Sequence, residues 1–264
     1  MVKNTEMDTE QITDKQSLAD IGISSIIGTR KVQQDTVFGF SGKNGSIGIV
    51  CDGMGGLARG EIASRIAVQS LVDAWFECTD NADVPEFLKQ AAIQADNKVF
   101  FQTDEYGRSI QTGTTVAAVI VKDKKLYWLS VGDSKIYIIR GTEIMLLNIE
   151  HNYRLELNLL LRQGKLTKEE YKAKEYQADA LISYLGMGNV CLMDINQEAF
   201  FLEDGDIVLV SSDGLSRSMQ ERDILKIVRQ NGKNMQNAAD ALTASLKNRK
   251  KQDNTSVVIL RFDF

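Results

Sequence analysis

Four aspartates stand where apolar, strand-like segments of the sequence end or begin. Asp52 and Asp213 close two such segments, Asp133 follows a third, and Asp253 stands just before the last one. Each has a small or turn-forming neighbour, so we expect these carboxylates to meet at one rim of a sheet. A cluster of carboxylates without His or Cys is typical of a site for a hard divalent cation, Mg²⁺ or Mn²⁺.

An ordinary alternative exists for each of these positions, because Asp-Gly is also a common turn sequence. For any one of the four aspartates a turn is the simpler interpretation. All four together, after segments that read as buried strands, favour the metal site.

One arginine could serve such a site. Arg30 and Asp35 lie in a loop between two early strand-like segments. The guanidinium group of Arg suits bidentate recognition of a phosphate. Considered alone, Arg30 reads as a surface charge.

The elements that must position these residues follow from hydrophobic periodicity. Helical spacing covers 61–78, 83–99, 220–230 and 235–247, and the second helix begins with a capping-box pattern at Asp83 and Glu86. Strand character covers 21–27, 36–40, 47–51, 114–121, 125–131, 135–140, 143–147, 198–202, 207–211 and 256–262. Short turns between successive strands favour antiparallel hairpins, and the order of elements favours antiparallel sheets flanked by helix pairs.

Composition excludes several functional classes. The 264 residues carry 31 Lys+Arg against 36 Asp+Glu, a net charge of −5, which argues against binding to nucleic acid. No apolar run is long enough to cross a membrane, and the polar first residues lack the apolar core of a signal peptide. The three cysteines are too far apart to suggest a disulfide framework. We therefore expect a cytoplasmic protein with no nucleic-acid or membrane partner.

Competing motifs fail on their context. Residues 53–58 match the dinucleotide pattern GxGxxA, but Asp52 would face the pyrophosphate with a like charge. Residues 204–208 match the DxDxV pattern of aspartyl-phosphate hydrolases, yet they form a turn before a strand. No cysteine has the C-x5-R spacing of cysteine phosphatases, and no GxxxxGK[ST] is present.

The sequence blocks taken together resemble the type 2C, metal-dependent protein serine/threonine phosphatases, in their bacterial form. The blocks occur in the family's order and span residues 28–256: Gly28-Thr29-Arg30, Gln34-Asp35, Asp52-Gly53-Met54-Gly55-Gly56, Thr112-Gly113-Thr114-Thr115, Gly132-Asp133-Ser134, Ser212-Asp213-Gly214 and Asp253-Asn254. The resemblance implies an α+β fold, an α-β-β-α sandwich of two antiparallel sheets flanked by helix pairs. Residues 1–16 read as a flexible lead and 17–264 as a single domain. Within this domain, 150–190 reads as helical and charged, and the resemblance implies that it is a variable flap-like insertion.

The resemblance further implies a centre of two Mg²⁺ or Mn²⁺ ions. Asp52 would bridge both ions, the Gly53 carbonyl would hold one, and Asp213 with Asp253 the other. Asp133, with Asp213, would bind a third, weaker ion.

The same resemblance assigns the remaining site residues and the reaction. Arg30 would hold the substrate phosphate, with Gln34, Asp35 and Asn254 beside the ligands, while His151 would be structural. A hydroxide bridging the two ions would then hydrolyse phosphoserine and phosphothreonine in proteins without a phospho-enzyme. The expected partner is a phosphoprotein, the target of a cognate Ser/Thr kinase, and the enzyme is expected to be a monomer.

The sequence departs from the family pattern at three positions, and two of these, Leu57 and Arg217, suggest a second hypothesis. Leu57 stands where many relatives have a His assigned as general acid, and Arg217 stands where relatives often have an Asp of the third metal site. Gln34 replaces a Glu, a change also seen in bacterial members. The alternative is a phosphoprotein-binding regulatory module with weak or no turnover.

Overall fold

The computed structural model describes residues 18–54, 59–78 and 82–264 of the chain. The predicted lead, residues 1–16, lies outside the described residues, as does Leu57. The division into a lead, one domain and an insertion stays a prediction.

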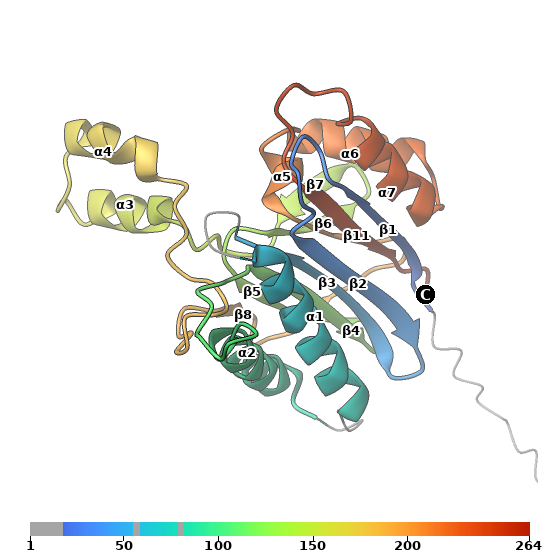
Figure 1. Ribbon diagram of the computed structural model, residues 1–264. Helices are drawn as coiled ribbons and strands as arrows, with labels where there is room; N and C mark the ends of the chain where they lie inside the picture. The colour runs from blue at the N-terminus through green and yellow to red at the C-terminus, as the bar shows by residue number, and fades with distance from the viewer. Residues whose placement is uncertain (1–17, 55–58, 79–81) are drawn as a thin grey trace, which may run out of the picture.

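Two antiparallel sheets form the centre of the molecule (Figure 1). One sheet has the order β2-β3-β4-β5-β8, with β9 pairing on β5. Its strands are β2 (Asp35–Gly42), β3 (Gly45–Asp52), β4 (Val116–Lys122), β5 (Lys125–Val131), β8 (Asp194–Ile195) and β9 (Phe200–Phe201). The other sheet has the order β1-β11-β10-β6-β7, with β1 (Asp20–Ile26), β6 (Lys135–Arg140), β7 (Glu143–Leu146), β10 (Ile207–Ser211) and β11 (Thr255–Arg261).

A pair of helices covers the outer face of each sheet. Helices α1 (Gly60–Glu77) and α2 (Val84–Phe100) pack on the first sheet, and α6 (Glu221–Gln230) and α7 (Met235–Ala244) pack on the second (Figure 1). Between the sheets lies a third apolar layer, to which Val50 and Val119 contribute from one side and Val210 and Val258 from the other. The predicted α-β-β-α sandwich is confirmed. Within the described part of the chain, no helix combines the length and the apolar character needed to cross a bilayer.

Local sequence explains why neighbouring strands pair as hairpins. The β4–β5 turn consists of Asp123 and Lys124, both at positive φ, the backbone conformation of a two-residue hairpin loop that matches the twist of the strands. The β2–β3 hairpin has a register that sets Asp35 directly opposite Asp52. Strand pairing therefore brings two carboxylates of distant sequence position to the same edge of the sandwich.

The segment 150–190 contains α3 (Tyr153–Arg162), α4 (Lys168–Lys174) and the 3₁₀ turn η1 (Glu175–Gln177). The two helices project from the body of the molecule (Figure 1) and share a small apolar cluster of their own, formed by Leu157, Leu166 and Ala178. The chain returns to the body through a bridge between Asn152 and Leu181. The helical character expected for this segment is confirmed.

Several predicted boundaries differ from the observed ones. The strand predicted over 198–202 is reduced to β9, because it pairs only with the first two residues of β5 at the sheet edge. The helix predicted over 235–247 ends at Ala244. A short helix, α5 (Asp213–Ser216), begins two residues after the end of β10, in a segment for which the sequence predicts no element.

Asp96 on α2 is a buried structural carboxylate, 2% exposed. Its Oδ1 accepts hydrogen bonds from the backbone amides of Gly186, Met187 and Gly188 at 2.7–3.2 Å, and its Oδ2 accepts one from Val190 at 3.0 Å. This one side chain therefore fixes the segment that leads from the α3–α4 region back to β8.

We expect Asp96→Ala to lower the free energy of unfolding by about 3 kcal/mol or more, since it leaves several buried amides without their charged acceptor. Urea denaturation followed by circular dichroism measures the change. Asn97→Ala, at the exposed next position of the same helix, is the control and should shift stability by less than about 0.5 kcal/mol. Equal effects of the two changes would contradict this role for Asp96.

Candidate functional site

One pocket at the end of the sandwich gathers the residues selected from the sequence. Its walls include all four aspartates, Arg30, Gln34, Gly53 and Asn254, with Asp35 adjacent to Asp52 in the β2–β3 pair. The full lining is Arg30, Gln34, Asp52, Gly53, Met54, Thr115, Asp133, Asp179, Leu181, Asp213, Arg217, Asp253 and Asn254. The four aspartates therefore meet at one rim of the described structure, as predicted, and residues from both sheets contribute to the pocket.

Asp52 ends β3, and the chain that precedes β4 holds its backbone on both sides. The Asp52 amide donates to Thr115 Oγ1 at 3.0 Å, while its carbonyl accepts from the Thr115 amide and from Thr114 Oγ1, both at 2.9 Å. Because these hydrogen bonds fix the backbone of Asp52, they also fix the point from which its side chain extends at the pocket.

Gly53 is required by a close approach of backbone. A Cβ atom there would lie 2.2 Å from the carbonyl oxygen of Gly60, the first residue of α1. Its amide donates to the Gln34 carbonyl at 3.0 Å, which joins the strand end to the loop before β2. Only glycine lets helix α1 begin this close to the site.

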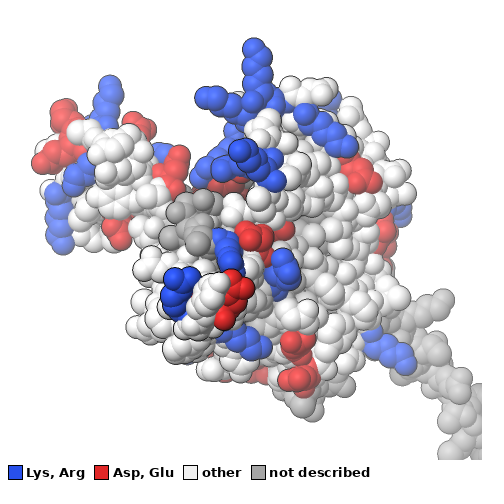
Figure 2. Space-filling view, viewed as in Figure 1, with Lys and Arg blue, Asp and Glu red and all other residues white. Residues whose placement is uncertain are grey.

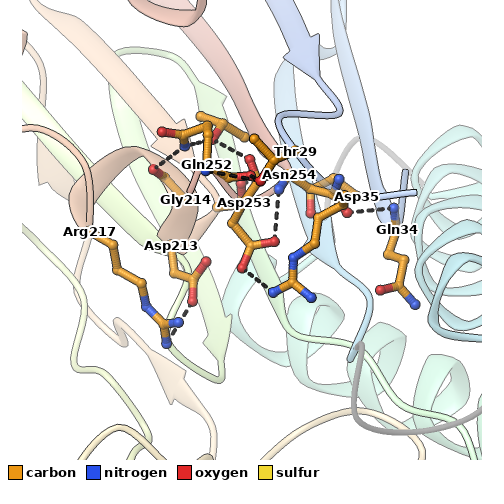
Figure 3. A network of polar contacts seen from close by, with 12 residues as sticks. Thr29, Gln34, Asp35, Asp213, Gly214, Arg217, Gln252, Asp253 and Asn254 are labelled. Carbon is orange, nitrogen blue, oxygen red and sulfur yellow. Dashed lines mark hydrogen bonds and ion pairs between the residues drawn. The ribbon is translucent and has the colours of Figure 1, made fainter. Parts of the chain in front are cut away.

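Asp213 and Arg217 belong to one helical turn. Asp213 is the first residue of α5, and Arg217 follows four residues later, so both side chains lie on the same side of the turn. Arg217 Nη2 is 2.8 Å from Asp213 Oδ2 (Figure 3) and 3.5 Å from Asp133 Oδ2. One guanidinium group therefore contacts two of the four pocket aspartates.

Asp133 sits in the turn between β5 and β6, where the chain passes from one sheet to the other. The preceding Gly132 has φ +103°, a conformation that favours glycine. The buried His151 holds this turn: its amide donates to the Gly132 carbonyl at 2.7 Å, and its Nδ1 accepts from the Gly132 amide at 3.4 Å. The expectation that His151 is structural agrees with these contacts.

Arg30 and Asp253 meet across a sequence separation of more than 200 residues. Arg30 Nη2 donates to Asp253 Oδ2 at 2.6 Å, and the Arg30 side chain is 51% exposed. Asp253 also accepts the amide hydrogen of Asn254 through Oδ1 at 2.8 Å. The rest of the Arg30 guanidinium group remains open to the pocket that it lines.

Asn254, Gln34 and Asp35 connect the two sheets behind the pocket. Asn254 Oδ1 accepts from the Gln34 amide (Figure 3), and its Nδ2 donates to the Ile27 carbonyl, both at 2.9 Å. Asp35 Oδ2 accepts from the hydroxyl of Ser212 at 2.8 Å, whereas the buried Asp35 Oδ1 has no hydrogen-bond partner in the described part of the chain. These contacts join the loop before β2 to the end of β10 and the start of β11, and Gln34 and Asn254 also line the pocket.

Burial and mutual repulsion raise the pKa values of the carboxyl groups. Burial is the larger cause in each case: it raises the pKa of Asp35 to about 6 and that of Asp133 to about 7. The pKa of Asp52 is raised well above its usual value by burial and then by the charges of Asp35 and Asp213. The pKa of Asp213 is raised as well, although Arg217 opposes the shift. A cation at this pocket would relieve both the desolvation and the repulsion.

The donor set fits a hard divalent cation in its chemistry, since it consists of carboxylates and backbone carbonyls without His or Cys. Among residues 18–54, 59–78 and 82–264, no three acidic, His or Cys side chains already enclose an ion position. Three of the four carboxylates instead contact guanidinium groups, Asp213 and Asp133 that of Arg217 and Asp253 that of Arg30. A metal ion would therefore compete with the arginines for these oxygens.

Sequence reasoning missed some of the lining. Asp179 and Leu181 reach the pocket from the segment after η1 and carry no signal in the sequence. Arg217 was identified as a departure from the family pattern, but its contacts with Asp133 and Asp213 become visible only once α5 is known. Leu57 lies outside the described residues, so its place relative to the pocket stays untested.

Comparison with known proteins agrees with this geometry. A family model described as protein phosphatase 2C matches residues 24–249. The serine/threonine phosphatase stp of Listeria monocytogenes serotype 4b (strain F2365) is 30% identical over 223 residues, which cover 83% of this chain and 86% of the relative.

Solved structures show the same architecture. The serine/threonine phosphatase of S. agalactiae is 29% identical, with a TM-score of 0.77 over 93% of this chain and 100% of the other. The catalytic domain of the phosphatase PstP, solved with two manganese ions, is 22% identical with a TM-score of 0.74 over 94% of this chain and 99% of the other, a likeness of fold alone. Family model, relatives and fold thus agree, and the chain belongs to the protein phosphatase 2C family as a bacterial-type protein serine/threonine phosphatase.

Proposed function

We propose that this pocket hydrolyses phosphoserine and phosphothreonine in proteins with the help of two Mg²⁺ or Mn²⁺ ions. Asp52, the Gly53 carbonyl, Asp213 and Asp253 would hold them. The observation that carries the proposal is the convergence of four aspartates and Arg30 on one pocket. The two manganese ions of the PstP structure support the same number here.

When bound, the ions would lower the pKa of a water molecule and neutralise charge on the phosphoryl oxygens. That contribution matters because hydrolysis of a phosphate monoester is among the slowest uncatalysed reactions in water. The raised pKa values of Asp52 and Asp213 indicate that protons and metal ions would compete for these ligands.

Arg30 would bind the substrate phosphate. Its side chain is half-exposed in the pocket and is held at one nitrogen by Asp253, which leaves further N–H groups for phosphoryl oxygens. A fixed guanidinium group also orients the phosphate, so that the scissile bond faces the carboxylate cluster.

Direct attack by water is favoured over a covalent intermediate. Among the described residues that line the pocket there is no Ser, Cys or His, and its aspartates contact arginines or are assigned here to the metal ions. The hydroxyl of Thr115 is occupied by the Asp52 amide and the Ser134 hydroxyl. We therefore propose that no phosphorylated enzyme forms.

Arg217 would take the place of the third, weaker ion. Its guanidinium group contacts Asp133 and Asp213, the two aspartates assigned to that ion by resemblance. A side-chain cation already neutralises them, so the pocket would bind two ions more tightly than a third.

The second candidate is a phosphoprotein-binding module with weak turnover. It is favoured by one observation, that both Asp213 and Asp253 are engaged by arginines. If the arginines hold these carboxylates against the metal, the pocket would bind a phosphate without hydrolysing it. The first experiment below separates the two candidates.

The protein partners and the setting follow from the same proposal. Substrates would be phosphoproteins made by a Ser/Thr kinase, and the enzyme would act as a cytoplasmic monomer.

We expect chelation of divalent metal to abolish hydrolysis of an aryl phosphate. We also expect Asp213→Asn to lower kcat/KM by more than about 100-fold, because mutation of a residue that only hydrogen-bonds to a metal ligand already costs about 10- to 100-fold. Activity is measured during titration with Mn²⁺. Asp123→Asn, an exposed turn residue outside the pocket, is the isosteric control and should retain full activity. Activity that survives chelation, or an active Asp213→Asn enzyme, would exclude the metal mechanism, whereas phosphopeptide binding without any turnover would favour the module.

We expect Arg30→Lys to raise KM for a phosphopeptide about 10-fold and Arg30→Ala to raise it further, with a smaller loss in kcat. The reason is that a lysine ammonium cannot reproduce the planar fork of a guanidinium on phosphate. Steady-state kinetics with one phosphothreonine peptide measures both constants, and Lys31→Ala, the exposed neighbour, is the control. An unchanged KM in both Arg30 variants would place the phosphate elsewhere.

We expect the metal-free protein to lose stability as the pH rises from about 4 to about 7. Asp35 and Asp133 have pKa values of about 6 and about 7 in the folded protein, above the usual 3.8, so the folded state binds more protons than the unfolded state in this range. Urea denaturation at a series of pH values in chelator measures the slope.

Two comparisons test the assignment of this slope. Asp133→Asn should flatten it between pH 4 and 7, whereas Asp123→Asn should not. Saturating Mn²⁺ should reverse its direction, because deprotonated carboxylates bind the ion better. A metal-free protein whose stability rises over this range would contradict the raised pKa values.

A further inference from the structure

A shallow groove leaves the catalytic pocket at Arg217. The same arginine that lines the pocket also lines this groove, whose other walls come from β6, α5 and the start of α6. Its lining is Lys135, Tyr137, Ser216, Arg217, Ser218, Met219, Gln220, Glu221 and Arg222. The groove is therefore a direct outward continuation of the site.

The groove continues along the exposed face of α6. Arg222 is shared with a further depression whose other walls are Leu225, Lys226, Arg229 and Gln230. Arg222, Lys226 and Arg229 are four and three residues apart, so they share one helix face, and all are exposed. Ile224 and Val228 on the opposite face are buried against the sheet. We name the line of cations Lys135, Arg217, Arg222, Lys226 and Arg229 the basic track.

The charge at the α6 end of this track lacks a close counter-ion among the described residues, whereas Arg217, at the pocket end, contacts Asp213 and Asp133. Arg222 has only a 3.9 Å contact with the neighbouring Asp223, and neither Lys226 nor Arg229 forms an ion pair in the described part of the chain. Lys135 is paired with Glu150, and Glu221 is the one acidic residue of the described lining. In a chain with a net charge of −5, this is a local excess of positive charge beside the catalytic pocket.

A second basic segment lies beside the groove. Lys247, Arg249, Lys250 and Lys251 are exposed and directly precede Gln252, which accepts a hydrogen bond from Ser218 of the groove at 2.9 Å. Figure 2 shows Lys and Arg side chains gathered over this part of the molecule, where α5, α6 and the loop after α7 lie. The positive surface therefore borders the groove on more than one side.

We propose that the basic track binds the polypeptide next to the phosphorylated residue of the substrate, and that it selects substrates with acidic side chains there. The inference rests on the proposed function, because it needs the phosphate to lie in the pocket. The ten residues of α6 span about 15 Å, the length of about five residues of extended chain. Acidic side chains within about ten residues of the phosphorylated position would therefore reach the cations.

A peptide fits this surface better than a nucleic acid does. The track is one narrow line that begins inside the catalytic pocket, whereas a duplex needs many phosphate contacts over a broad basic face. Complementary charge at such a surface raises the rate of encounter and selects among partners, and salt weakens it.

The experiment uses two phosphothreonine peptides that differ only in their flanks, one with Glu and one with Gln at the flanking positions. We expect KM for the Glu peptide to be about 5- to 10-fold lower at low salt, with equal kcat, and the difference to shrink as salt is added. The triple variant Arg222→Gln, Lys226→Gln, Arg229→Gln should remove most of the difference while hydrolysing an aryl phosphate at the original rate. Glutamine keeps a good helix propensity, and circular dichroism verifies folding.

The matched control is Arg65→Gln, Lys89→Gln, Lys98→Gln, which removes the same charge from exposed positions on α1 and α2 of the opposite helix layer. It should keep the preference for the Glu peptide. The inference is overturned if the two peptides have the same KM, or if both triple variants act alike. It is also overturned if the α6 variant loses binding to a 20-base-pair duplex or to anionic vesicles while its peptide KM is unchanged. Absence of aryl phosphate turnover in every protein would instead indicate failure of the proposed function, and fluorescence titration with the peptides then still tests the track.

Discussion

The repulsion among buried carboxylates at the end of the sandwich is the constraint on which the rest of the structure depends. Asp52, Asp133 and Asp213 all have raised pKa values, chiefly because burial disfavours their charge. A fold would ordinarily avoid such a cluster, since unpaired buried charge is costly. It persists here because backbone contacts hold each aspartate in place and because cations offset the charge.

Two arginines supply part of that offset from the chain itself. Arg30 contacts Asp253, and Arg217 contacts both Asp213 and Asp133. Both guanidinium groups are about half-exposed, so each can respond to a substrate or an ion that enters. If Arg30 binds phosphate and the aspartates bind metal, as we propose, the two binding events are linked, because both depend on the same carboxylates.

Much of the fold and most of the site could be predicted from the sequence, for physical reasons. Strand alternation and short turns determine which neighbouring segments pair, so antiparallel sheets flanked by helix pairs and the placement of Asp52 at a strand end were predictable. The sandwich of two sheets was predicted from the family resemblance. The aspartates are recognisable because each stands beside a residue that permits a turn or a close approach, as Gly53 does, where a Cβ atom would lie 2.2 Å from the Gly60 carbonyl oxygen.

The parts that could not be predicted are those that depend on tertiary placement. The pairing of Arg217 with Asp213 requires the single turn α5, which is too short to leave a periodic signal. Asp179 reaches the pocket only because the chain returns from a projecting pair of helices, and Asp96 fixes that return through amides 90 or more positions away. Contacts at such sequence separations follow from the assembled fold rather than from local propensity.

The chain passes from one sheet to the other at Asp133, and this has a consequence for how the molecule loses activity. Asp52 belongs to one sheet, Asp213 and Asp253 border strands of the other, and the Gly132–Asp133 turn links the two. The pocket is therefore a seam between two layers, which contact each other through apolar side chains and through a few hydrogen bonds such as that of Ser212 to Asp35. Its geometry depends on the relative alignment of these layers. Any slip of one layer against the other would disperse the carboxylates while leaving every strand and helix intact. Heat or pressure would then abolish the activity of the enzyme before its secondary structure is lost. Activity would therefore report on the alignment of the two layers.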